Sequence, residues 1–149
     1  MQLKNKTATT YLALLLGIFG AHRFYLKGWG DAWGWLQAVI TSVGLVGMRR
    51  VWVLGQDDQL AWALIPFFGF SLFAACLATI IFGLMSEDKW NKTYNQDGSA
   101  NPFDYGLAGR TSATTVFAIV LALLLGATAL MSAVAFTGQR YFEHSLKSA

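Results

Sequence analysis

The sequence predicts an all-α integral membrane protein, in which a helical hairpin is followed by two further transmembrane helices, about four apolar helices in all. Hydrophobic residues make up 55% of the 149-residue chain and charged residues only 13%, whereas roughly a quarter of the residues in an ordinary globular domain are charged. Four apolar runs separated by polar breaks occupy most of the chain, and most of the charges lie in the breaks. This pattern leaves no room for a separate soluble domain.

The first apolar run, residues 9–20, is short for a membrane span. Its roughly 12 residues would cover about 18 Å as a helix, against a hydrocarbon core about 30 Å thick. Residues 7–11 can prolong the helix, and the stems of Lys4 and Lys6 are long enough to reach back to the surface. We therefore expect a thinly spanning helix over residues 6–19. A basic start before a short apolar run also occurs in signal peptides, but no clear cleavage site follows here.

The break after this run holds a cationic pair beside an aromatic pair, namely His22, Arg23, Phe24 and Tyr25. Charged groups are costly at a bilayer centre, and aromatic rings with polar edges settle at the headgroup level. We predict a turn at the membrane surface. His22 and Arg23 are either a proton-handling or anion-binding pair, or a structural pair in which Arg23 anchors to lipid phosphate or helix carbonyls while His22 fills the turn. We favour the structural interpretation.

The second run, residues 29–48, begins with glycines and one carboxylate. Gly30 and Gly34 have the four-residue spacing that lets two helix backbones approach closely. Asp31 either caps the helix that starts here or pairs with Arg23 or Lys27. Capping is the favoured role.

The third run, residues 60–85, is long enough to cross a membrane with some tilt. Pro66 lies near its start and deprives the Trp62 carbonyl of its helical partner. This predicts a kink or a local break within residues 62–67.

The fourth run, residues 114–136, contains no charge and is the clearest spanning helix. Small residues recur every four positions along the last two runs, a spacing that favours close helix contact. They are Ser71, Ala75, Thr79 and Gly83 in the third run, and Thr114, Ala118, Ala122 and Gly126 in the fourth. We expect these two ladders to pack together; the alternative is that such spacings arise by chance in long membrane helices.

Two polar segments complete the chain. Residues 86–112 are predicted to be an extramembrane loop, whose aromatic residues either form a contact surface for a partner or lie in the headgroup belt. Residues 138–149 are predicted to be a juxtamembrane tail with a short interfacial helix. If all four runs span, Lys and Arg divide six to five between the two sides, and this slight excess indicates that both termini are cytoplasmic.

Residues 4–26 carry a more specific pattern. A Lys-x-Lys start, an apolar run ending in Gly17-Ile18-Phe19-Gly20, and the block Ala21-His22-Arg23-Phe24-Tyr25-Leu26 resemble the first half of the TM-two domain family, whose name refers to two transmembrane helices. The resemblance implies a bacterial-type member with an extra C-terminal helix, in the bacterial plasma membrane.

The resemblance extends over residues 4–70 and departs from the family in two places. Lys27-Gly28 and Leu36-Gln37 occupy family positions, and Trp62 takes the tryptophan position, but Pro66 stands where the family has an aspartate. Residues 47–59 then look like an insertion; in an alternative alignment Trp52 and Asp57 form the pair. The remainder of the third helix, residues 71–85, and the C-terminal transmembrane helix, residues 113–137, lie outside the resemblance.

The residues supply no recognisable catalytic set, which would need a nucleophile or metal ligands with an orienting partner. Cys76 is the only cysteine, which excludes an internal disulfide and argues against a structural zinc site. The basic residues are scattered, so a nucleic-acid footprint is not supported. We expect no enzyme activity, no cofactor and no metal, and the bilayer, a second copy of the chain or a membrane protein as partners.

Two function classes follow from this reasoning. The first is a non-catalytic multi-pass membrane protein that acts as a scaffold or interaction subunit. The alternative is a small oligomeric transporter or channel, which needs polar groups along a path. The candidates for such a path are Gln37, Thr41, Ser42, Ser71, Thr79, Thr128 and Ser132.

Overall fold

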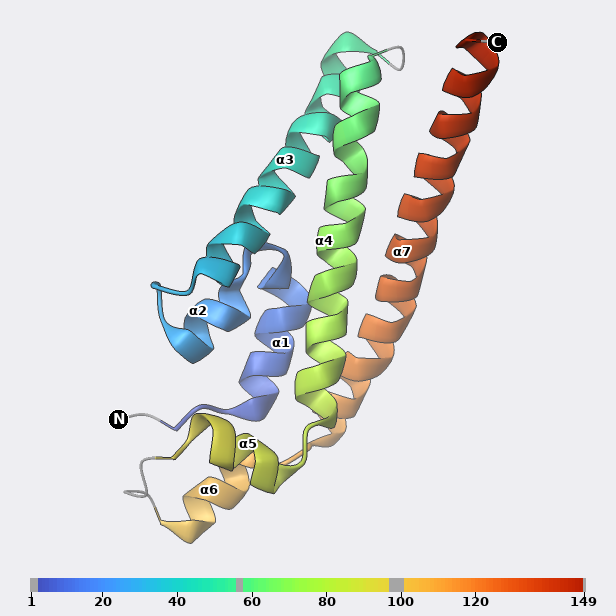
Figure 1. The fold of residues 1–149 in the computed structure, drawn as a ribbon. Coiled ribbons are helices and arrows are strands. Elements are labelled where there is room, and N and C mark those ends of the chain that lie inside the picture. The colour runs from blue at the N-terminus through green and yellow to red at the C-terminus, as the bar shows by residue number, and fades with distance from the viewer. Residues whose placement is uncertain (1–2, 56–57, 97–100, 149) are drawn as a thin grey trace.

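The computed structural model of the chain describes residues 3–55, 58–96 and 101–148 (Figure 1). Over these residues the chain is helical and contains no strand, which confirms the all-α class. The elements are α1 (Lys6–Leu16), the short 3-10 helix η1 (Gly17–Phe19), α2 (Ala21–Lys27), α3 (Ala32–Leu54), α4 (Gln59–Leu84), α5 (Glu87–Tyr94), α6 (Pro102–Gly109) and α7 (Ala113–Ser148).

In the described part of the chain, two helical stretches are long and apolar enough to cross a membrane, not clearly the four that were predicted. They are α4 and the stretch Phe103–Leu146, which contains most of α7. The first apolar run forms the shorter helical stretch Lys6–Phe19. Helix α3 falls below the same criterion because its 23 residues include several glycines, polar side chains and two arginines. Length and composition thus support a membrane protein and leave the number of crossings open.

Helix α4 is the central element, and the other long segments pack around it (Figure 1). Helix α1 and η1 lie beside its C-terminal half, where a Cβ on Gly17 would be 2.9 Å from the Cβ of Ala75. Helix α3 lies beside its N-terminal half, where a Cβ on Gly47 would be 2.7 Å from the Cβ of Leu64. Glycine therefore sets how closely both neighbours approach α4.

The predicted surface turn is a short helix that folds back beside α1. Helix α2 spans Ala21–Lys27, and the Nζ of Lys4 donates to the backbone carbonyl of Tyr25 at 2.7 Å. The start of α1 and the end of α2 therefore lie at the same level. The sequence-based interpretation treated residues 6–19 as a full crossing, whereas α1, η1 and α2 form a hairpin that returns toward the end from which it began.

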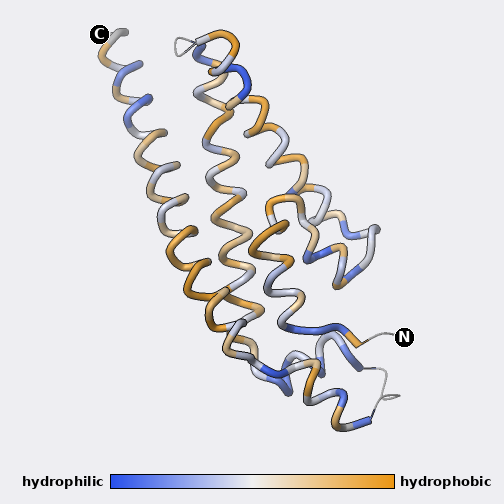
Figure 2. The backbone as a smooth tube through the Cα atoms, turned by 180° about the vertical axis from the view of Figure 1, so that it is seen from behind, coloured by the Kyte–Doolittle hydropathy of each residue, from blue (hydrophilic) through white to orange (hydrophobic). Residues whose placement is uncertain are grey.

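The two ends of the chain lie at opposite ends of the bundle (Figure 1). The start of the described chain lies at the same end as α5 and α6, and the end of α7 lies at the same end as the connection from α3 to α4 but apart from it. Figure 2 shows that hydrophilic segments gather at these two ends and around α2. The side of a membrane on which each terminus lies stays a prediction.

Two further segments differ from the sequence-based expectations. Residues 86–112 contain the helices α5 and α6 instead of a continuous loop, with residues 97–100 outside the described part. Their polar composition favoured a loop, but the Ser86 side chain caps α5. The predicted tail does not form a separate short helix and instead continues α7 as far as Ser148. Residues 47–54 continue α3, and the insertion relative to the family over residues 47–59 stays a prediction.

Helix α4 continues unbroken with Pro66 inside it. The predicted local break at residues 62–67 therefore does not occur, while the alternative of a kink stays a prediction. Contacts with α3 on both sides of the proline, at Leu64 and Phe68, support the helix through the position where one backbone hydrogen bond is missing.

Candidate functional site

The block from Gly20 to Leu26 begins with a glycine that no other residue can easily replace. Gly20 has a φ of +75°, in the left-handed region, and its N–H donates to the Gly17 carbonyl at 2.9 Å. A Cβ at Gly20 would lie 2.5 Å from the carbonyl oxygen of Gly34. Both backbone conformation and space therefore require glycine where α2 meets the start of α3.

Asp31 fills both roles that the sequence left open. Its Oδ2 accepts from the backbone N–H of Gly34 at 3.0 Å, so it caps α3, and the same carboxylate forms an ion pair with Arg23 at 2.5 Å. The Asp31 side chain is 9% exposed and that of Arg23 is 29% exposed. The hydrogen bond from Arg23, followed by that from Gly34, holds the pKa of Asp31 below its usual value. This carboxylate is thus ionised and tied to the helix start.

Three aromatic rings from the same segment of the chain pack against one another. Phe24 stacks on Trp29 with centroids 5.1 Å apart and tilts against Trp35 at 5.3 Å. The Nε1 of Trp35 donates to the Trp29 carbonyl at 2.9 Å. A Cβ on Gly34 would lie 2.6 Å from the Phe24 ring, whereas a Cβ on Gly30 would meet nothing within 4 Å. Of the predicted glycine pair, only Gly34 makes a close contact.

His22 and Tyr25 lie in different environments. His22 is 5% exposed, and its ring lies 5.6 Å from that of Phe82. Its Nδ1 is the only buried side-chain nitrogen or oxygen without a hydrogen-bond partner in the described part of the chain. The Tyr25 hydroxyl accepts from the backbone N–H of Asn5 at 3.2 Å, with the Lys4 Nζ 4.8 Å from the ring centre. Tyr25 therefore attaches the N-terminal segment to α2, while His22 is packed among apolar groups.

A second turn of the same design lies at the other end of α3. The Nε of Arg50 is 2.6 Å from the Oδ2 of Asp58, and Asp58 accepts from the backbone N–H of Leu60 at 3.2 Å, at the start of α4. Gly55 ends α3 with a φ of +86°, as Gly28 ends α2 with a φ of +82°. The hydrogen bond from Arg50 lowers the pKa of Asp58.

The two turns share the sequence pattern Arg-x4-Gly-x2-Asp-x3-Trp. It occurs as Arg23, Gly28, Asp31 and Trp35, and again 27 positions later as Arg50, Gly55, Asp58 and Trp62. We call residues 23–35 the first turn and residues 50–62 the second turn. Sequence reasoning missed the second turn, but comparing the chain with itself at this offset of 27 positions reveals it. Asp57 lies outside the described residues.

Comparison with known families accounts for the N-terminal part of this arrangement. Residues 2–55 match the model of the TM2 domain, the family that the block Ala21–Leu26 resembles. Residues 2–55 are thus similar to a TM2 domain, and this range is called the TM2 domain below. The matched range includes α1, α2, α3 and the first turn, and it ends at Gly55, so Trp62 and Pro66 lie beyond it. No curated protein and no solved structure matches the chain.

A buried polar junction joins the TM2 domain to α4. The Thr41 hydroxyl donates to the Ile18 carbonyl in η1 and lies 2.5 Å from the Ser71 hydroxyl. The Nε2 of Gln37 donates to the backbone carbonyl of Ser71 at 2.9 Å. These side chains supply hydrogen bonds where α1 ends inside the bundle, which is the condition for a helix to stop within a membrane.

The other polar residues proposed for a transport path are not gathered at this junction. The hydroxyls of Ser42, Thr79 and Thr128 each donate to a carbonyl of their own helix, at 2.8, 3.0 and 2.8 Å. Ser132 is exposed on α7. Three of the seven candidates, Gln37, Thr41 and Ser71, therefore come together, and their hydrogen bonds link them to one another or to the backbone.

The two small-residue ladders meet only in part. On α7, Ala118 and Ala122 are fully buried, and a Cβ on Gly126 would lie 2.8 Å from the Cβ of Cys76 in α4. On α4, a Cβ on Gly83 would lie 2.6 Å from Ile119. At the other ladder positions, Ser71 and Ala75 contact the TM2 domain, the Thr79 hydroxyl donates to its own helix, and Thr114 of α7 is exposed.

Proposed function

We propose that the chain is a non-catalytic multi-pass membrane protein that acts as a scaffold or interaction subunit. Helices α3, α4 and α7 cross the bilayer, and the hairpin of α1 and α2 enters from one side and returns to it. The 23 residues of α3 cover about 35 Å at 1.5 Å per residue, and an Arg–Asp turn holds each of its ends. This is enough for a crossing despite its mixed composition.

Three crossings give an orientation in the bacterial plasma membrane. Lys and Arg divide seven to four between the two ends of the bundle, which favours a cytoplasmic N-terminus and an external C-terminus. The end with the N-terminus has Lys4, Lys6, Arg23, Lys27, Lys89, Lys92 and Arg110, and the other end has Arg49, Arg50, Arg140 and Lys147. The division of Lys and Arg into six and five, given above, assumed that the first apolar run also crosses the membrane.

Site-directed labelling tests this orientation. Single cysteines at Lys92 and Gln139, each in a Cys76→Ala background, are exposed to a membrane-impermeant maleimide on intact cells. We expect labelling at position 139 without permeabilisation and at position 92 only after it. Labelling of both positions on intact cells would contradict the three crossings and would indicate an even number.

The junction of Gln37, Thr41 and Ser71 is the observation that supports a scaffold over a transporter. A transport path needs polar groups facing a water-filled route, but the hydrogen bonds of these three side chains connect α3 to η1 and α4. Outside the bundle, large aromatic side chains are exposed on the TM2 domain, with Trp33 at 65% and Trp52 at 92%. Such rings suit either headgroups or a membrane-protein partner.

Two measurements distinguish the function classes. Purified protein in liposomes should show no solute or ion flux above that of empty vesicles, while cross-linking in native membranes should recover a defined partner that Trp33→Ala or Trp52→Ala releases. Leu146→Ala, which removes an exposed side chain of α7 outside the TM2 domain, is the matched control. Robust flux that Thr41→Val or Gln37→Leu abolishes would contradict the proposed scaffold function and favour a transporter or channel.

A further inference from the structure

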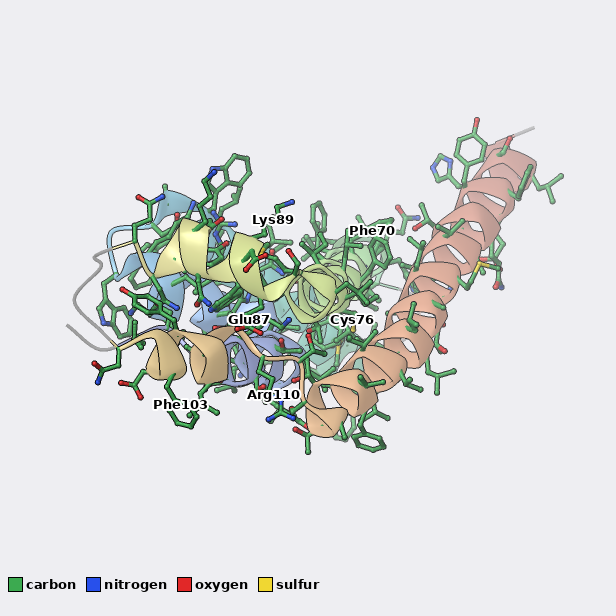
Figure 3. All side chains as sticks on the ribbon, turned by 90° about the horizontal axis from the view of Figure 1, so that it is seen from below. Phe70, Cys76, Glu87, Lys89, Phe103 and Arg110 are labelled. Carbon is green, nitrogen blue, oxygen red and sulfur yellow. The ribbon has the colours of Figure 1, made fainter. Side chains whose placement is uncertain are left out.

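A groove of about 530 Å³ lies between the N-terminal half of α4 and the C-terminal part of α7. It forms where α7 leans away from α4 on its way to the C-terminus (Figures 1 and 3). The side chains that carry the argument are Trp62, Pro66 and Phe70 from α4 and Arg140, Tyr141 and Glu143 from α7. The groove lies outside the TM2 domain, and the junction described above does not contribute to it.

The floor of the groove is apolar and runs along the membrane helix α4. Trp62, Pro66 and Phe70 lie on successive turns and together cover about 12 Å of the helix axis. Half of a typical hydrocarbon core is about 15 Å deep. The floor is therefore long enough to lie along most of an acyl chain within one leaflet.

The rim of the groove is a pair of opposite charges held in place by aromatic rings. The Arg140 guanidinium lies 3.4 Å from the centre of the Trp62 ring, and Trp62 stacks on Phe136 at 4.5 Å. The Nη1 of Arg140 donates to the Oε2 of Glu143 at 2.7 Å, and Gln139 donates to the Oε1 at 2.9 Å. Stacking uses the face of a guanidinium and leaves its N–H edge for hydrogen bonds, so this arginine is arranged to contact a phosphate.

We propose that the groove binds a phospholipid with a phosphoethanolamine headgroup. The acyl chain lies along Pro66 and Phe70, the phosphate accepts hydrogen bonds from Arg140, and the ammonium donates to the Glu143 carboxylate, which has lone pairs beyond its two present bonds. Adjacent positive and negative side chains complement a headgroup with both charges. A choline headgroup has no N–H to donate, and a glycerol headgroup has no cation. This binding goes beyond the scaffold function and does not depend on it.

Native mass spectrometry of the full-length, delipidated protein tests the proposal. The protein is titrated separately with phosphatidylethanolamine, phosphatidylglycerol and phosphatidylcholine of matched acyl chains. We expect phosphatidylethanolamine to bind about tenfold more tightly than phosphatidylcholine, the size expected for one charge-assisted hydrogen bond. Glu143→Gln should remove this difference and leave phosphatidylglycerol binding unchanged. Arg140→Gln should weaken binding of all three lipids.

A matched control and a second measurement keep the test decisive. Arg110→Gln changes an exposed arginine at the opposite end of the bundle and should alter no affinity. In nanodiscs, phosphatidylethanolamine brominated on its acyl chain should quench Trp62 fluorescence, identified by difference from Trp62→Phe. If Arg140→Gln lowers the melting temperature, a loss of lipid binding in that variant could come from unfolding. The lipid selectivity of Glu143→Gln and the quenching of Trp62 then decide whether the groove binds the lipid.

Four results would overturn the proposal. The first is equal affinity for the three lipids, and the second is an equal loss with Arg110→Gln. The third is full competition by free phosphoethanolamine or inorganic phosphate, which would indicate a headgroup site without an acyl chain. The last is a change in dimer content with Arg140→Gln at unchanged lipid binding, which would assign the groove to a second copy of the chain.

Discussion

The first and second turns have the same local chemistry in different surroundings. In each turn an arginine pairs with the aspartate that caps the next helix, at 2.5 Å and 2.6 Å, and a glycine with positive φ ends the preceding helix. Trp35 of the first turn packs within the TM2 domain against Phe24 and Trp29, whereas Trp62 of the second turn packs against Phe136 and Arg140 of α7. The local pattern therefore starts a helix in both turns, and the surrounding helices determine which side chains the tryptophan packs against.

Equivalent positions in the two turns show how the neighbours act. Gly34 follows Asp31 by three residues, and Ala61 follows Asp58 by three; both are buried. Val51 in the second turn occupies the place of Phe24 in the first. Because the Phe24 ring leaves no space for a Cβ on Gly34, the first turn needs glycine where the second accepts alanine.

Gly34→Ala should therefore have the largest effect among substitutions that compare the turns. The added Cβ would overlap the Phe24 ring, and overpacking of this kind costs about 1–3 kcal/mol. The reciprocal Ala61→Gly should cost about 1 kcal/mol through helix propensity. Thermal unfolding in detergent measures both changes. Gly30→Ala, which meets nothing within 4 Å, is the control, and a Gly34→Ala variant as stable as this control would contradict the Phe24 contact.

The two glycines that end the preceding helices should respond alike. Gly28 and Gly55 both have positive φ, and a Cβ on either would meet nothing within 4 Å. Replacement by alanine should cost about 1–3 kcal/mol at each position, because only the backbone conformation is penalised. Asparagine should restore nothing, because a φ near +80° together with a ψ near 180° is a combination that only glycine adopts readily. Unequal losses at the two positions would show that the turns differ in their backbone and not only in their neighbours.

Substitution of the capping aspartates should produce smaller drops in melting temperature. Asp31→Leu and Asp58→Leu each remove a cap and an ion pair, whereas Asp31→Asn and Asp58→Asn keep an oxygen that can cap the helix. The loss should be somewhat greater at Asp31, because its side chain is 9% exposed and that of Asp58 is 13% exposed. Equal tolerance of leucine and asparagine at Asp31 would discard the capping role.

Helix limits were the part of the fold most predictable from the sequence. The third apolar run, predicted over residues 60–85, is α4 (Gln59–Leu84), and the first, predicted over residues 6–19, is α1 with η1. Polar residues bound both runs, so local composition determines where the helix begins and ends. The same reasoning placed Asp31 at a helix start beside Arg23, because a cap and an ion pair depend on short spacings.

Features that depend on contacts between distant residues were not predictable in this way. The return of α2 beside α1 depends on hydrogen bonds from Lys4 and Asn5 to Tyr25, about 20 positions away. The α4 ladder divides between two neighbours because Ser71 meets Thr41 while Gly83 meets Ile119. The groove at Arg140 exists because α7 leans away from α4, and no spacing within either helix encodes that angle.

Acid sensitivity is the smallest expected difference between the turns. The pKa values of Asp31 and Asp58 are both lowered, chiefly by hydrogen bonds from Arg23 and Arg50. Each carboxylate therefore contributes stability that is fully present above the ordinary aspartate pKa of about 3.9 and is lost as the pH falls through the lowered value in the folded protein. The melting temperature should stay level from pH 7 to about 5 and fall below about 4. Asp31→Asn and Asp58→Asn should each reduce that acid-induced fall, Asp31→Asn slightly more, and the double variant should reduce it most. An unchanged fall in the double variant would mean that other carboxylates cause it and that neither ion pair stabilises its turn.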